Sequence, residues 1–160
     1  MSRPSALRML GFLRGLVRGA VAWLVGFVLT LVAGAAGLYG TGGFSGTATA
    51  YLRAHAVPPA LDVGLLIVVL AVAVGGARAG RKARSGVTGR IRAAVESIRG
   101  TEHARLRAAA VAGAFVALGY AAAGFVVGLW VGRHAATALV GGLVYGLLVG
   151  VPTAVVAARY

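Results

Sequence analysis

Four long apolar stretches, separated by short polar segments, dominate the pattern of hydrophobic positions. They cover about residues 20–39, 60–78, 108–131 and 135–158. An α-helix needs roughly 20 apolar residues to cross the ~30 Å hydrocarbon core of a bilayer, and each stretch is close to that length. The pattern therefore predicts an all-α integral membrane protein, folded as a four-helix transmembrane bundle.

Two of the stretches leave alternatives. The first resembles a signal peptide, with a basic start, an apolar run and the small residues 33–35 (AGA), but the apolar run is long for one, and we favour a retained span. The second has a short uncharged run, Val63–Ala77. It needs Ala60 and Leu61 at one end, and at the other Arg78, reaching its charged head to the interface.

The connecting segments predict turns and one hairpin. Residues 41–49 form a small, polar, glycine-rich loop, residues 50–57 a brief interfacial turn, and Pro58-Pro59 the first turn of the second span, where proline is tolerated. The two-residue turn Arg133-His134 forces the third and fourth spans into an antiparallel hairpin. Pro152 removes a helical hydrogen bond, and we expect it to kink the fourth span.

Two basic segments outside the spans have helical periodicity. Residues 7–19 place leucines opposite arginines, which predicts an amphipathic helix at the interface; a merely positive flank that sets orientation is the alternative. Within the 79–107 loop, Val87, Ile91, Val95 and Ile98 recur at helical spacing. We expect a second amphipathic helix there, on the inner leaflet. The whole chain, 1–160, then forms a single membrane domain.

Composition agrees with a membrane protein and excludes thiol chemistry. Mean hydropathy is +0.89, and only 12% of the residues are charged, against about a quarter in soluble domains. The chain has no cysteine. Disulfides, thiolate metal sites, iron–sulfur clusters and lipidated cysteines are therefore excluded.

The 16 basic residues are distributed unevenly around the spans. Four precede the first span, one follows it, nine lie between the second and third, one lies between the third and fourth, and one comes near the end. Cytoplasmic segments of membrane proteins are enriched in Lys and Arg. The alternation predicts a multi-pass protein of the cell membrane with both termini in the cytoplasm.

The net charge of +13 also raises nucleic-acid binding. We disfavour it, because topology accounts for most of the charge and the basic loop lacks interleaved aromatic residues. Anionic lipid headgroups are the expected partner. The residues expected to contact them are Arg14, Arg18, Arg81, Lys82, Arg84, Arg90 and Arg92.

Small residues recur every fourth position in the third and fourth spans. Such spacing makes a thin groove along one helix face, which lets a neighbouring helix approach closely. The neighbour can be another span of the same chain or another subunit, and the pattern leaves both open. The predicted helix-packing residues are Gly124, Gly128, Gly132, Gly142, Gly146, Gly150 and Ala154.

Few polar side chains fall near the middle of the spans: Thr30, Tyr120 and Tyr145. They serve either structural hydrogen bonds or a substrate path. No Asp, Glu, Lys, Arg or His lies inside a predicted span other than Asp62 and Arg78 at the two ends of the second, although such residues mark pumps, proton relays and coupled transporters. This absence argues against those classes, against haem held by histidine pairs, and against enzymes that use aspartate-bound metals.

Ionisable residues gather instead at the predicted outer face: His55, Asp62, Arg53, Arg133 and His134. A metal site is conceivable but lacks recognisable ligand spacing. We prefer separate roles, with Asp62 at the start of the second span, His55 in a loop and Arg133-His134 in a turn. A surface pair between Asp62 and Arg133 is the remaining alternative. We predict no metal, cofactor or catalytic residue.

Two segments carry a resemblance to a known group of proteins. Residues 19–27 (GAVAWLVGF), followed by Thr30, resemble the first span of small haloarchaeal four-span membrane proteins of unknown function, and residues 139–146 (LVGGLVYG) are similar to their last span. The resemblance implies neither an activity nor site residues.

The function expected from the sequence is non-catalytic. We expect an accessory or scaffolding subunit that packs through small-residue helix faces in a larger membrane assembly. The alternative is an oligomeric channel or passive transporter for a small solute, with a path lined by Thr30, Tyr120 and Tyr145. An enzyme ranks below both, since no nucleophile–base pair is visible.

Overall fold

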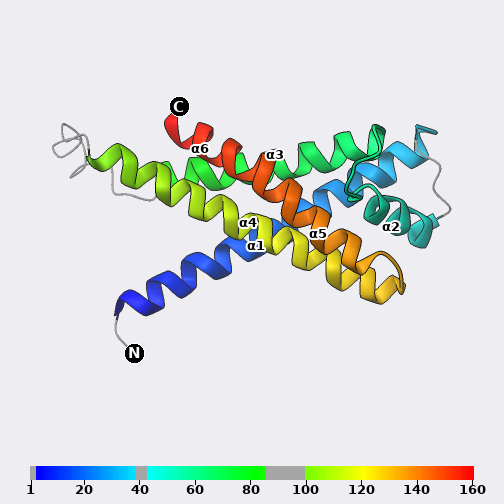
Figure 1. The fold of residues 1–160 in the computed structure, drawn as a ribbon, viewed down its shortest axis with the longest axis horizontal. Coiled ribbons are helices and arrows are strands. Elements are labelled where there is room, and N and C mark those ends of the chain that lie inside the picture. Colours follow the sequence, from blue (N-terminus) through cyan, green and yellow to red (C-terminus); the bar gives the residue numbers. More distant parts are fainter. Residues whose placement is uncertain (1–2, 39–42, 86–99) are drawn as a thin grey trace.

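The computed structural model of the chain describes residues 3–38, 43–85 and 100–160, and every regular element in these ranges is a helix (Figure 1). Four segments are long and apolar enough to span a membrane: Met9–Ala35, Val63–Lys82, Glu102–Val131 and Ala135–Arg159. The prediction of an all-helical bundle with four segments long and apolar enough to be spans is confirmed. The elements are α1 (Arg3–Ala35), α2 (Gly43–Arg53), α3 (Val63–Ser85), α4 (Gly100–Val131), α5 (Ala135–Tyr145), the π-helix η1 (Gly146–Gly150) and α6 (Val151–Arg159).

The bundle has two distinct ends (Figure 1). At the basic end lie the start of α1, the end of α3, the start of α4 and the end of α6, together with both termini. A contact between Arg159 Nε and Glu102 Oε1, at 3.9 Å, joins α6 to α4 there. At the α2 end lie α2 and the turn between α4 and α5.

Helix α1 crosses α4 by backbone-to-backbone contact. A Cβ added at Gly19 would overlap the carbonyl oxygen of Val116, and one added at Gly119 would overlap the carbonyl oxygen of Leu16. Only glycine allows two helix backbones to approach so closely. Before the crossing, α1 diverges from the other helices toward its N-terminus (Figure 1), and its residues Met9 and Leu13 are exposed.

The second span begins later than predicted. Pro58, Pro59, Ala60 and Leu61 precede α3 rather than forming its first turn. Asp62 sets the start, because its carboxylate Oδ1 accepts a hydrogen bond of 2.9 Å from the backbone N–H of Leu65. The missing length comes from the other end, since α3 continues to Ser85.

Glycines with positive φ end two of the spans. Gly37 (φ 73°) follows α1, and Gly132 (φ 73°) follows α4. In each case a backbone N–H reaches back five residues, from Leu38 to the Ala33 carbonyl and from Arg133 to the Gly128 carbonyl, the pattern of a Schellman cap. The first span therefore ends at Ala35, before the predicted residue 39.

The fourth span is one helical run interrupted by a π turn. The π-helix η1 separates α5 from α6, directly before Pro152, which cannot donate the next helical hydrogen bond. The disturbance expected from Pro152 thus takes the form of a wider turn. The hydroxyl of Thr153 donates to the carbonyl oxygens of Val149 (2.8 Å) and Gly150 (3.0 Å) and adds partners for the backbone there.

The largest difference from the predicted elements is α2. The glycine-rich loop expected over residues 41–49 is wrong from Gly43 onward, because a helix runs to Arg53. Thr47 donates its hydroxyl hydrogen bond to the Gly43 carbonyl, and Ala48, Tyr51 and Leu52 are fully buried. The burial of one apolar face stabilises a helix that glycine content alone disfavours.

Trp23 is part of the core, although tryptophan near the end of a span is common at membrane interfaces. It is 2% exposed, stacks on Phe27 with ring centroids 5.6 Å apart, and lies 5.2 Å from the Tyr51 ring. Exposed aromatic residues at the bundle ends include Phe44, Trp130 and Tyr160.

Candidate functional site

The most polar part of the interior is a cluster of three side chains at the α2 end. Tyr51 on α2 and His55, just after α2, are four residues apart and therefore share a helix face. Tyr120 comes from the middle of α4. The Tyr51 and Tyr120 hydroxyl oxygens are 2.5 Å apart, and the Tyr120 hydroxyl lies 3.0 Å from His55 Nε2. All three residues are at most 1% exposed.

The hydrogen bonds of this cluster have one consistent direction. His55 Nδ1 lies 2.7 Å from the carbonyl oxygen of Tyr51, which can only accept, so Nδ1 carries the proton. In a neutral ring Nε2 is then an acceptor, and the Tyr120 hydroxyl donates to it. The Tyr120 oxygen in turn accepts from the Tyr51 hydroxyl. The three residues form a closed circuit with no unused proton.

Burial keeps this cluster neutral. It lowers the pKa of His55 to about 4. Hydrogen bonds with the Tyr51 and Leu52 backbone raise this pKa, but by less than burial lowers it. Burial also raises the pKa of the Tyr51 hydroxyl, an effect that the hydrogen bond with Tyr120 reduces. At neutral pH the site therefore holds an imidazole and two phenols, without a charge.

Two glycines provide the room for this cluster. A Cβ at Gly26 on α1 would overlap the Tyr51 hydroxyl, and a Cβ at Gly141 on α5 would overlap the carbonyl oxygen of His55. The segment that follows α2 is also tied to α5, because the Tyr145 hydroxyl donates a 2.8 Å hydrogen bond to the Ala56 carbonyl. Helices α1, α4 and α5 thus all hold α2 in place.

The three polar residues predicted at mid-span are therefore occupied within the chain. Tyr120 bonds to Tyr51 and His55, and Tyr145 bonds to the Ala56 carbonyl. Thr30 donates to the carbonyl of Gly26, one turn back on its own helix, at 3.0 Å. Each of these hydroxyls has a structural hydrogen bond.

The predicted outer group of ionisable residues divides in two. Arg53, Asp62 and His134 line an open cavity of about 520 Å³ beside α2, together with Thr137, a volume within the range of small-molecule sites. His55, expected in a loop, is instead buried in the cluster. Within the described ranges, no three His, Asp or Glu side chains come close enough to hold a metal.

The small residues of spans three and four face neighbours inside the bundle. An added Cβ at Gly142 or Gly146 would press on α4, at Ala121 and Ala117 respectively, and Gly150 faces Val72 on α3. Ala154 is fully buried. Gly124 faces Trp23 and Ala138, and Gly128 faces Ala135. Gly132 differs, since nothing lies within 4 Å of it, and its role is the left-handed turn that ends α4.

The predicted lipid-contact residues lie near the basic end where the structure describes them. Arg14, Arg81 and Lys82 are exposed, and Arg18 is half-buried. Arg84 belongs to the last turn of α3. Arg90 and Arg92, with the amphipathic helix expected around them, fall outside the described residues. The other segment expected at the interface continues without a break into α1 from Arg3.

Sequence reasoning missed Tyr51 and misplaced His55. A signal was available: Ala48, Tyr51, Leu52 and His55 recur at i, i+3, i+4 and i+7, the spacing of a buried helix face. The glycines and threonines of the same segment obscured it.

Chemically, the cluster is a closed neutral network and not a reactive one. A proton cannot pass around Tyr51, Tyr120 and His55 by reversal of their hydrogen bonds, because the Tyr51 carbonyl that accepts from His55 Nδ1 has no proton to donate. Its arrangement fits a structural role, in which the hydrogen bonds hold α2 against the end of the bundle.

The fold and this site define a class, a multi-pass helical membrane protein with a buried tyrosine–histidine hydrogen-bond network between its helices. No protein-family model, curated protein or solved structure matches the chain. The resemblance to haloarchaeal four-span proteins stays a prediction.

Proposed function

We propose that the protein is a non-catalytic accessory or scaffolding subunit of a larger assembly in the cell membrane. The basic end would face the cytoplasm, and the α2 end the outside. Within the described ranges, the α2 end carries Arg53 and Arg133, whereas Arg14, Arg81 and Lys82 belong to the basic end. The positive-inside rule supports this orientation.

One observation carries the docking part of the proposal: an open apolar groove between α1 and α4, of about 480 Å³. Its floor contains the small residues Gly119, Ala122 and Ala123, and Leu24 (54% exposed) and Val126 (62% exposed) stand at its sides. In lipid, helices associate by close packing over small residues. The α1–α4 groove therefore suits a transmembrane helix of a partner subunit.

This groove replaces the surface that the sequence suggested. Apart from Gly132, the glycines predicted for packing in spans three and four face residues of their own chain, and they support packing within the monomer. The small residues beside the α1–α4 crossing remain uncovered.

The channel alternative gains no support from the interior of one chain. Thr30, Tyr120 and Tyr145, which would line its path, are all engaged in internal hydrogen bonds. A channel would then need a path between several copies of the chain, and the purification experiment below can detect such an oligomer.

The test is purification of the tagged protein from its native membrane in mild detergent. We expect a membrane partner in fixed stoichiometry, lost with Val126→Trp and kept with Val140→Trp. Val126 and Val140 are both exposed, at 62% and 53%, but Val140 lies on α5 away from the groove. Equal partner recovery with both variants would contradict docking in the groove. A homo-oligomer that makes liposomes leak one solute would establish the channel instead.

A further inference from the structure

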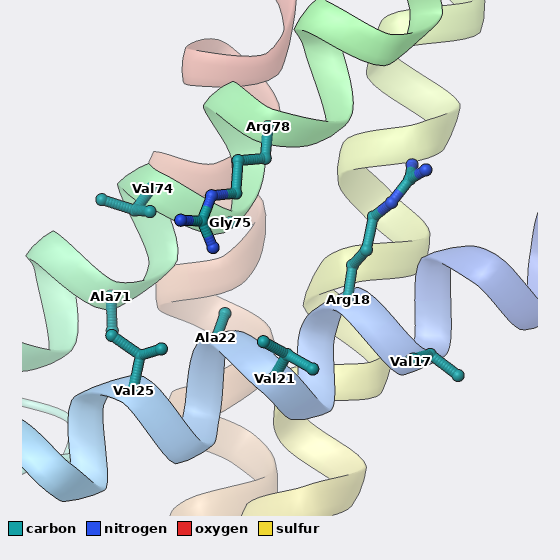
Figure 2. A pocket seen from close by; sticks show the side chains of 9 residues that line it. All are labelled: Val17, Arg18, Val21, Ala22, Val25, Ala71, Val74, Gly75 and Arg78. Atoms are coloured by element: carbon teal, nitrogen blue, oxygen red, sulfur yellow. The ribbon is translucent and has the colours of Figure 1, made fainter.

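A second groove lies on the other side of α1, against α3 (Figure 2). We name it the α1–α3 groove. Its floor is apolar, formed by Ala22 on α1 and by Ala71 and Gly75 on α3, and Val25 and Val74 stand at its sides. These two valines are 37% and 44% exposed, so the groove opens toward the surrounding lipid.

Two arginines stand at the end of this apolar groove that faces the basic end. Arg18 extends from α1 and Arg78 from α3, and both line the groove; in Figure 2 the Arg78 guanidinium reaches back toward Gly75, and the Arg18 guanidinium extends away from it on the side of α4. Neither has a hydrogen bond or ion pair within the described part of the chain. The acids among the described residues lie elsewhere: Asp62 caps α3 at the opposite end, and Glu102 lies near Arg159.

The arginines lie close to the basic end of their spans. At a rise of ~1.5 Å per residue, Arg18 is about 26 Å along α1 from Ala35, and Arg78 is about 23 Å along α3 from Val63. In a hydrocarbon core ~30 Å thick, their backbone positions are then about 4–7 Å from the interface. An arginine side chain is long enough to extend its guanidinium group over that distance.

The size of the groove restricts its occupant. It encloses about 100 Å³, well below the roughly 300–1,000 Å³ of sites that hold a whole small molecule. It is nevertheless open along its length to lipid. A segment of one acyl chain fits such a space, while the rest of the molecule stays in the bilayer.

We propose that the α1–α3 groove binds one anionic phospholipid from the leaflet at the basic end. The headgroup phosphate binds Arg18 and Arg78, whose flexible side chains turn toward it, because guanidinium groups bind phosphate oxygens through paired hydrogen bonds. One acyl chain lies along Val25 and Val74. The lipid supplies an anion that the described residues do not provide, and it fills the gap between α1 and α3. This groove and the partner groove on the α4 side share only Val17 among their lining residues.

The experiment measures phospholipid that remains bound to the full chain. The protein is purified in mild detergent, delipidated, incubated with phosphatidylglycerol or phosphatidylcholine, and analysed by mass spectrometry of the intact complex. We expect one phosphatidylglycerol per chain and at least about tenfold weaker retention of phosphatidylcholine, because its trimethylammonium cation neutralises the headgroup and is repelled by the two arginines. Inorganic phosphate alone should not displace the lipid, because it lacks the acyl chain. Equal retention of the two lipids would overturn the proposal.

Matched variants separate a defined site from diffuse charge. The double variant Arg18→Gln/Arg78→Gln should lose the bound phosphatidylglycerol. Arg14→Gln/Arg81→Gln removes the same charge near the same end outside the groove, and should keep it. Equal losses in both would show general electrostatic attraction and overturn the site.

A second pair tests the acyl part without changing charge. Val25→Trp fills the groove and should reduce retention by about tenfold or more. Val28→Trp, on the lipid-exposed surface of α1 outside the groove, should have no effect. Unchanged helix content and elution volume confirm that each variant is folded. A polypeptide that cross-links to a cysteine at Val21, in protein without bound lipid, would assign the groove to a protein partner instead.

Discussion

His55 shows how much of this fold depends on single polar residues. Its ring is buried, and its two nitrogens bond to the Tyr51 carbonyl and the Tyr120 hydroxyl. The sequence singles out Tyr120, because a hydroxyl inside an apolar span is conspicuous. It does not reveal that His55 meets Tyr120, since 65 residues separate them and no local pattern encodes that contact.

The direction of the hydrogen bonds predicts unequal effects of two similar substitutions. Tyr120→Phe removes the hydroxyl between Tyr51 and His55 and leaves two buried groups without a partner. Tyr51→Phe removes only the first donor of the circuit. We expect Tyr120→Phe to destabilise by about 2–4 kcal/mol and Tyr51→Phe by about 1 kcal/mol, because each unsatisfied buried group costs ~1–3 kcal/mol. Thermal unfolding in detergent measures both, and equal losses would contradict the assigned directions.

The burial of His55 also predicts a dependence on pH. In the unfolded chain its pKa is 6.5, and in the folded chain it is about 4. The unfolded state therefore binds the proton more tightly. The stability associated with neutral His55 is fully present above pH 6.5 and is lost as the pH falls to about 4, by about 3 kcal/mol.

The control for this pH dependence is His55→Gln, which has no titrating ring at this position. Unfolding temperatures of both proteins are compared between pH 7.5 and 4.5. We expect the wild type to lose more stability across this range than the variant. Parallel curves would show that His55 is accessible to protons in the folded state.

At the scale of elements, the ends of the helices depend on a few backbone positions. The apolar runs predict the four spans, and the acid at position 62 predicts a helix start. The apolar run alone does not show that α3 begins only after Asp62, because Ala60 and Leu61 before it are also apolar. Helix α2 was missed for a related reason: its stability comes from burial against α1, α4 and α5, not from its composition.

The α1–α4 crossing yields a prediction with a control on the same helix. Gly19→Ala places a methyl group against the Val116 carbonyl and forces the helices apart. We expect a loss of about 1–3 kcal/mol, as in other overpacked interfaces. Gly11 is exposed, with nothing within 4 Å, and Gly11→Ala should be neutral or stabilising by up to ~1 kcal/mol. Thermal unfolding compares them; similar values would mean that the crossing tolerates a wider separation.

At the scale of the whole molecule, both the charge distribution and the fold distinguish a basic end of the bundle from an α2 end. The distribution of arginine predicts which end faces the cytoplasm. The structure places both termini at one end and α2 at the other (Figure 1). Most of the basic residues lie in segments next to the spans, so the sequence alone is enough to predict an orientation. It does not show which helices the glycines pack against, because those contacts depend on the fold.

The orientation is directly testable because the chain has no cysteine. Leu61 is 93% exposed near the start of α3, and Tyr160 is 83% exposed at the end of the chain. In intact cells, a cysteine replacing Leu61 should react with a membrane-impermeant maleimide. A cysteine replacing Tyr160 should react only after the membrane is opened. The opposite labelling would reverse the predicted topology.

The position of α2 has a consequence for the order in which the protein can be completed. The ribosome makes α2 before α4 and α5, yet the groups that satisfy Tyr51, His55 and the Ala56 carbonyl belong to those later helices. Until both have inserted, the nascent chain holds a tyrosine, an imidazole and a backbone carbonyl without their final partners. The hydrogen-bond network of α2 therefore cannot form until the last span has been made. A chain truncated after α3 would leave the polar groups of Tyr51, His55 and Ala56 without these partners.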